Sequence, residues 1–111
     1  MERTEKNIYN KIKELSDIDL QRKMWLNENN NTGLISSYVE LMNTLFDDYN
    51  FDYFIDEIAP KLGLGKDIVL ELNRLRTLLN DYREKPSDYE ILQDSQWRRI
   101  VEQAKVVLNT W

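Results

Sequence analysis

The chain has 111 residues, of which 41% are hydrophobic and 32% are charged, and its formal net charge is −5 at pH 7. These values are typical of a folded globular protein, and the length predicts a single domain spanning residues 1–111. The chain contains neither cysteine nor histidine, which excludes disulfides, thiolate metal sites and the usual catalytic base at neutral pH.

The first third of the chain predicts two helices and a loop. Residues 2–15 carry apolar side chains at helical spacing, and Ser16 or Asp17 can cap a short second helix. Residues 27–33, NENNNTG, are rich in turn-forming residues and predict a loop. The charged start, MERTEKNIYNKIKEL, does not have the pattern of a secretory signal, and no apolar run approaches the ~20 residues that span a bilayer. These features favour a cytoplasmic protein without a membrane segment.

The central stretch, residues 36–58, predicts two short helices that meet at residues 47–50. Ser37 and Glu40 form the pattern of a capping box at the start of the first helix. Pro60 is expected to end the second helix, because proline lacks the backbone N–H and disfavours helix in the preceding residue. The apolar stripe of the first helix consists of Tyr38, Leu41, Met42, Leu45, Phe46 and Tyr49.

The same stretch holds the whole negative excess of the chain. No lysine or arginine lies between Lys23 and Lys61, whereas residues 25–60 contain seven acids. Several of these acids are unfavourably placed: Asp47 and Asp48 lie in the last turn of a helix, where the helix dipole is negative. Asp52 and Asp56 are like charges four residues apart, which repel. The pattern indicates either a binding surface for a basic partner or a solubilising face on which Asp47, Asp48 or Asn50 caps the second helix.

The remainder of the chain predicts a long helix, a short helix and a last helix. The long helix covers residues 67–82, a second capping box begins at Ser87, and Asp94 or Ser95 caps the last helix, in which Trp97 is expected to lie in the core. No segment alternates apolar and polar residues as a strand does. The predicted fold is therefore all-α, a compact bundle of five to seven short helices. Arg74, Arg76, Arg98 and Arg99 are expected to be solvated charges that pair with neighbouring acids.

The residues do not indicate an active site. Gly63-Leu64-Gly65 has no preceding strand and predicts a turn rather than a phosphate-binding loop. Asp48, Asp52 and Asp56 are spaced by four, and such carboxylates could bind a divalent metal ion if one continuous helix carried all three. The expected break between Asp48 and Asp52 argues against this metal-dependent enzyme, which stays the less favoured alternative. We predict no catalytic residues, no bound metal and no cofactor.

A sparse set of residues runs through most of the chain and carries a resemblance: Trp25-Leu26, Ser36-Ser37, Glu40-Leu41, Leu45-Phe46-Asp47-Asp48, Phe51-Asp52, Phe54-Ile55, Ile91-Leu92, Asp94, Trp97, Ile100-Val101 and Ala104-Lys105. In these residues the chain resembles small all-helical bacterial immunity proteins of toxin–immunity systems, including those of contact-dependent growth inhibition. This resemblance implies a cytoplasmic inhibitor that blocks the active site of a cognate toxin, often a nuclease. A nuclease site is basic because it holds phosphates, so an acidic inhibitor complements it.

We therefore predict a protein that binds a basic protein partner, and the resemblance names a toxin domain as that partner. The open alternative is a small helical adaptor or regulatory protein with an unrelated basic partner. Direct binding of nucleic acid is not expected, because the acidic face repels phosphates. The predicted partner-binding residues are Glu40, Asp47, Asp48, Tyr49, Asp52, Tyr53, Asp56 and Glu57.

Overall fold

Helices account for 74% of the chain in its computed structural model, which describes residues 1–111 and contains no strand. The predicted all-α fold class is thus confirmed, and the seven helices form a compact bundle. Two of these helices each contain a wider π-helical segment, labelled η. In chain order the elements are α1 (Arg3–Leu15), α2 (Ile18–Leu26), α3 (Tyr38–Asn43), η1 (Thr44–Asp48), α4 (Phe51–Tyr53), η2 (Phe54–Ile58), α5 (Ala59–Lys61), α6 (Lys66–Asp81), α7 (Asp88–Gln93) and α8 (Ser95–Thr110).

Side-chain caps mark the start of five helices. Glu2 caps α1, because its carboxylate accepts from the backbone N–H groups of Thr4 and Glu5. Asp17, Ser37, Ser87 and Asp94 each accept a hydrogen bond from a backbone N–H in the first turn of the helix that follows. Such a bond satisfies one of the donors that a helix start leaves without a partner. The predicted caps Ser37 and Ser87 are confirmed, and of the alternatives Ser16 or Asp17 and Asp94 or Ser95 the caps are Asp17 and Asp94.

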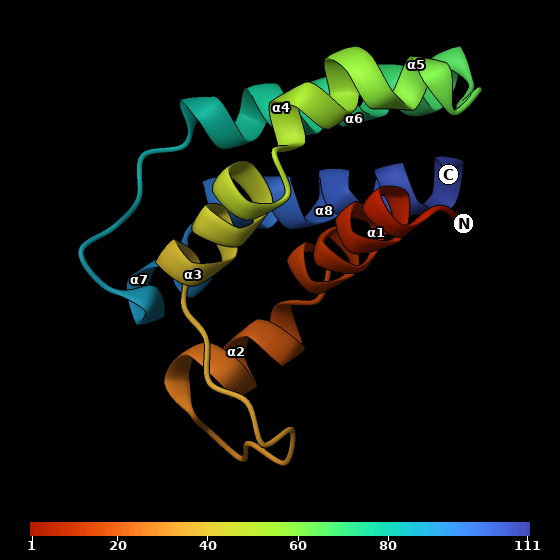
Figure 1. Cartoon of the computed structure of the whole chain (residues 1–111). Coiled ribbons are helices and arrows are strands. Elements are labelled where there is room, and N and C mark those ends of the chain that lie inside the picture. The colour runs from red at the N-terminus through yellow and green to blue at the C-terminus, as the bar shows by residue number, and fades with distance from the viewer.

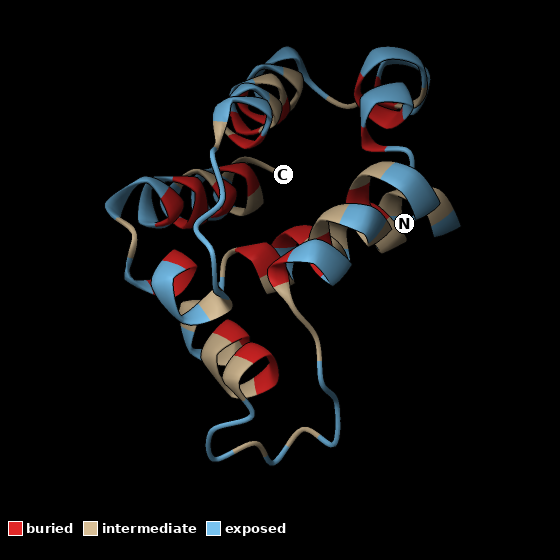
Figure 2. Cartoon of the chain, turned by 90° about the vertical axis from the view of Figure 1, so that its left-hand side faces the viewer, coloured by how far each residue is buried: buried red, intermediate tan, exposed pale blue.

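The C-terminal helix α8 forms the centre of the bundle. It contacts both α6 and α1, and Figure 1 shows it running between them. Figure 2 shows the buried residues of the helices facing one another across this centre. Trp97 of α8 is fully buried, as predicted. Its indole Nε1 donates a hydrogen bond of 2.9 Å to Oε1 of Gln21 in α2.

Gln21 is fully buried and joins the two halves of the chain. Its Nε2 donates to the backbone oxygens of Glu14 and Leu15, at 3.0 and 2.9 Å, while its Oε1 accepts from Trp97. A buried amide is tolerated only when its donors and its acceptor are paired, and here they are. The sequence analysis did not identify this residue, because a glutamine within an amphipathic helix has the composition of a solvent-facing residue.

The two helices of the central stretch meet at the predicted break. The first, α3 with η1, ends at Asp48, and Asn50 adopts the left-handed conformation with φ of 49°. Asparagine is one of the few residues that enters this conformation readily. The prediction that Asp47, Asp48 or Asn50 caps the second helix is wrong, since no side chain makes a hydrogen bond at its start.

Pro60 does not end the second helix, which corrects another prediction. The helix runs from Phe51 through η2 and continues in α5 to Lys61. Proline disrupts a regular helix because its ring clashes with the carbonyl four residues earlier. The wider π-helical turn that immediately precedes Ala59-Pro60 changes this register and relieves the clash.

The two ends of the chain lie at the same end of the bundle (Figure 1). Nε1 of Trp111 donates a hydrogen bond of 3.0 Å to the carboxylate of Glu5, and its ring meets that of Tyr9 edge to face. These contacts fix the end of α8 against α1. None of the helices has both the length and the apolar composition needed to cross a membrane.

Candidate partner-binding surface

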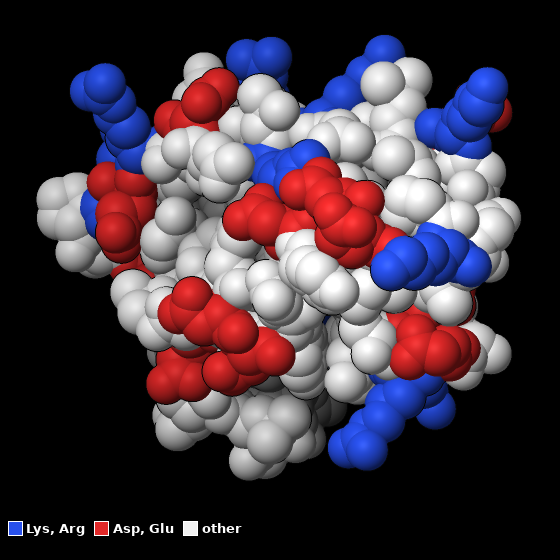
Figure 3. Space-filling model, turned by 45° about the horizontal axis from the view of Figure 1, so that its top comes forward, with Lys and Arg blue, Asp and Glu red and all other residues white.

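The predicted acidic surface is divided between two helices that lead into and out of the break at Asn50. Glu40, Asp47 and Asp48 belong to α3–η1, whereas Asp52, Asp56 and Glu57 belong to α4–η2. All six acids are exposed. Figure 3 shows acidic side chains gathered in separate clusters on this side of the molecule, with basic side chains mostly around its edge.

The acids of α4–η2 are held by an arginine from a distant part of the chain. Arg76 of α6 donates to both oxygens of Asp56, at 2.9 and 3.1 Å, and to Oδ1 of Asp52 at 3.3 Å. This bidentate geometry is the strongest arrangement for a guanidinium and a carboxylate. The bond from Arg76 is the main reason that the pKa of Asp56 lies below its ordinary value. The repulsion between Asp52 and Asp56 is therefore offset within the folded protein.

Arg76 itself is largely buried, although the sequence predicted a solvated charge at this position. Its side chain is only 18% exposed, and it also bonds to Asn73 one turn earlier in α6. The expected pairing with acids is confirmed, but the guanidinium is not a solvated charge. The hydrogen bond to Asp56 is also the main reason that the pKa of Arg76 is raised.

The acids of α3–η1 have no such partner. The carboxylates of Glu40, Asp47 and Asp48 make no ion pair and no side-chain hydrogen bond. All three lie on exposed positions of this one helix. Glu57 also lacks an ion pair, although it lies on the other helix. Among the six acids of the predicted surface, the three on α3–η1 and Glu57 are therefore without an ion pair.

The two predicted tyrosines differ in their surroundings. Tyr53 is 49% exposed and lies on the outer side of α4, between Asp52 and the following turn. Tyr49 is only partly exposed and packs against the hydrophobic core. Tyr53 can therefore offer an exposed ring to a partner, whereas Tyr49 mainly supports the end of η1.

The three aspartates of the metal-binding alternative do not form a cluster. Asp48 lies before the break at Asn50, and Asp52 and Asp56 follow it and bind Arg76. No group of three or more acidic side chains in the structure is arranged so that it could hold a metal ion. A cation at Asp52 and Asp56 would have to displace the guanidinium.

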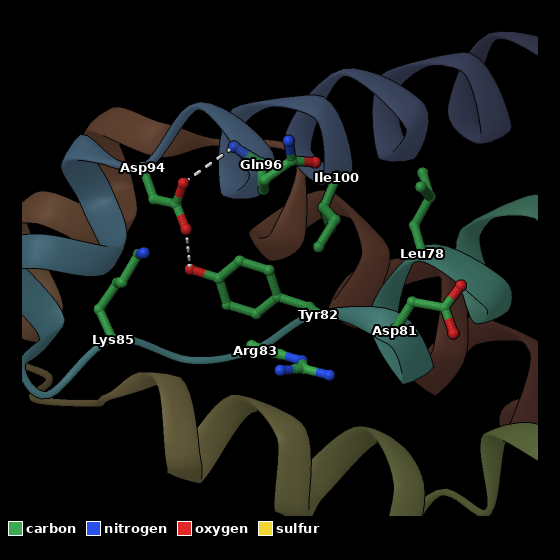
Figure 4. A pocket seen from close by; sticks show the side chains of 8 residues that line it. All are labelled: Leu78, Asp81, Tyr82, Arg83, Lys85, Asp94, Gln96 and Ile100. Atoms are coloured by element: carbon green, nitrogen blue, oxygen red, sulfur yellow. Dashed lines mark hydrogen bonds between the residues drawn. The ribbon is translucent and has the colours of Figure 1, made fainter.

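A cleft of about 280 Å³ lies elsewhere, between the end of α6 and the start of α8 (Figure 4). Within it the hydroxyl of Tyr82 donates to Oδ2 of Asp94 at 2.8 Å, and Oδ1 of Asp94 accepts from the backbone N–H of Gln96 at 3.0 Å. Both carboxylate oxygens are therefore engaged. Burial, together with Asp94, raises the pKa of Tyr82 well above its ordinary value. This arrangement holds the segment between α6 and α8 in place.

The sequence analysis expected Arg76 to pair with acids, but it did not identify Asp52 and Asp56 of another helix as its partners. The only local signal for Arg76 is its position beside Leu75, on the flank of the apolar stripe of α6. A charge on such a flank is close enough to a neighbouring helix to reach its side chains.

No family model, no curated protein and no solved structure matches this chain.

Proposed function

We propose that the chain is an immunity protein, which binds and neutralises a basic toxin domain through the acidic surface of α3–η1. The observation that carries the proposal is that Glu40, Asp47 and Asp48 are exposed and unpaired on one helix. On the neighbouring helix, by contrast, Arg76 supplies a counter-charge for Asp52 and Asp56. Leaving three carboxylates without a partner raises the negative potential at this point of the surface.

A basic nuclease domain fits this surface by charge. Complementary potentials steer two proteins together and raise the association rate constant, an effect that salt weakens. Tyr53 can add an aromatic contact with a polar end, which is common among residues that dominate binding energies. The resemblance to immunity proteins agrees with a partner of this kind.

The decisive experiment takes as the candidate toxin the protein encoded directly beside this one in the genome. The two proteins are expressed separately, and binding is measured by surface plasmon resonance at several salt concentrations, together with inhibition of the toxin. Glu40→Gln/Asp47→Asn/Asp48→Asn is expected to lower the association rate constant at least about 10-fold at low salt and to reduce its salt dependence. A wild-type protein that neither binds nor inhibits the neighbouring toxin would contradict the proposal.

The matched control is Asp52→Asn/Asp56→Asn. It removes a comparable amount of formal charge, but from carboxylates that Arg76 already neutralises in part. Its association rate constant is expected to stay within about threefold of the wild type. Circular dichroism and urea unfolding of each variant separate a loss of binding from a loss of folding. Equal effects of the two variants would show that general surface charge, and not α3–η1, governs the encounter.

A further inference from the structure

The loop between α2 and α3 exposes two adjacent aliphatic residues. Leu34 is 63% exposed and Ile35 is 76% exposed, which makes them more exposed than any other large hydrophobic residue except Met1. Val39, in the first turn of α3, is 52% exposed. Figure 2 shows the loop projecting from the bundle with most of its residues exposed. Single apolar residues are ordinary on a surface, but adjacent ones on a projecting loop are not.

Side-chain hydrogen bonds hold this loop in one conformation. Nδ2 of Asn30 donates to the backbone oxygen of Leu34 at 2.7 Å and to Oδ1 of Asn27 at 3.0 Å. The hydroxyl of Thr32 accepts from the backbone N–H of Leu34 at 3.0 Å. The backbone N–H of Ser36 donates to the oxygen of Met24 in α2 at 3.1 Å, which fastens the loop to the bundle. These bonds use the backbone of Leu34 and leave its side chain free.

A preformed apolar projection is favourable for binding. Burial of an aliphatic side chain contributes in proportion to the apolar area removed from water. A loop that is already ordered loses less conformational entropy when a partner covers it. The side chain of Leu34 also borders a shallow groove of about 370 Å³ along α1 and α2, together with Leu20 and Met24. The projection is therefore continuous with further apolar surface.

The loop and the unpaired acids are close enough to belong to one interface. Residues 38–47 form a continuous helix, which rises about 14 Å, and the extended residues between Ile35 and Tyr38 add about 10 Å at most. A stable interface buries about 800 Å² on each partner, an area roughly 30 Å across. Ile35, Val39, Glu40 and Asp47 thus fall within one such area, without any lysine or arginine between them in the chain.

We propose that Leu34, Ile35 and Val39 form an apolar anchor, which inserts into a hydrophobic crevice of the partner beside its cations. The occupant is a basic protein with an apolar crevice, and this assignment rests on the proposed function. The two parts of the surface have different tasks. The acids of α3–η1 accelerate encounter, whereas the aliphatic anchor slows dissociation, because it loses its contact with water in the complex.

The test is Leu34→Ser/Ile35→Ser, measured against the same toxin domain. We expect the dissociation rate constant to rise about 100-fold while the salt dependence of association is unchanged. The matched control is Leu70→Ser/Val106→Ser, which removes two exposed aliphatic residues, 50% and 42% exposed, from α6 and α8. Its dissociation rate constant is expected to equal that of the wild type. Urea unfolding confirms that both variants fold.

The outcomes separate this inference from the proposed function. If the wild type binds and the loop variant dissociates at the wild-type rate, the anchor is refuted and the immunity function stands. If the loop variant and its control weaken binding equally, the anchor is refuted as well. If the loop variant loses binding while Glu40→Gln/Asp47→Asn/Asp48→Asn does not, the anchor stands and steering by the acids is refuted. If the wild type does not bind the toxin, both proposals are wrong.

Discussion

The helices on either side of Asn50 carry similar acidic sequences in different electrostatic settings. On α4–η2, Asp52 and Asp56 share one well-covered arginine, so their charges are part of the structure of the bundle. On α3–η1, Asp47 and Asp48 have no counter-charge and lie near the negative end of a helix. The ion pairs with Arg76 give Asp52 and Asp56 a role in the stability of the fold, whereas Asp47 and Asp48 have no such role. A run of acids is therefore informative about binding only after its internal partners are known.

The largest effect is expected at the joint that separates the two regions. Asn50→Ala places a residue with an unfavourable left-handed conformation at φ of 49°, and the free energy of unfolding should fall by about 1 kcal/mol. Asn50→Gly is the control and should be nearly neutral, because Asn50 makes no capping hydrogen bond. Urea unfolding measures both. Equal destabilisation by alanine and glycine would show that the side chain of Asn50, and not its backbone conformation, matters.

Removal of the shared arginine should make the two regions alike. Arg76→Met keeps most of the apolar stem but leaves Asp52 and Asp56 without a counter-charge, so the free energy of unfolding should fall by roughly 0.5–1 kcal/mol. Arg99→Met, at an exposed position of α8, provides the control and should change stability much less. An unchanged urea midpoint in Arg76→Met would mean that the pair contributes nothing to folding. In binding assays the freed acids should raise the association rate constant.

Acid titration should distinguish the regions through Asp56. Its pKa is lowered in the folded state, so the unfolded chain takes up the proton first as the pH falls. The stabilisation is therefore present above the ordinary pKa and is lost as the pH drops below about 4. Arg76→Met should weaken this loss as the pH falls below about 4, which urea midpoints at successive pH values would reveal. A pH dependence identical to that of the wild type would contradict the role given to Arg76.

The smallest effect is expected from the unpaired acids. Asp47→Asn/Asp48→Asn should leave the free energy of unfolding unchanged or raise it by a few tenths of a kcal/mol, because it removes negative charge from a helix C-terminus. Asp52→Asn/Asp56→Asn should instead lower stability, because it removes the partners of Arg76. Urea unfolding at low salt compares the two. A clear loss of stability in Asp47→Asn/Asp48→Asn would reveal a structural role for these acids and weaken the case for a binding surface.

The sequence by itself determined the helical class, most helix starts and the break at Asn50. These features depend on residues no more than four apart, because caps, apolar stripes and left-handed turns are local. Ser37, Ser87 and Asp94 cap helices where the pattern predicts. The exposure of all six acids also follows from their position opposite the apolar stripe. What the chain binds stays a prediction.

The tertiary structure decided which of those acids are neutralised. Arg76 is 24 residues from Asp52 and 20 from Asp56, so their contact depends on how α6 packs against η2. A tertiary contact between α2 and α8 likewise pairs the buried amide of Gln21 with Trp97, 76 residues away. Such pairs form only when whole helix faces are buried together, and no local pattern along the chain encodes which faces will meet.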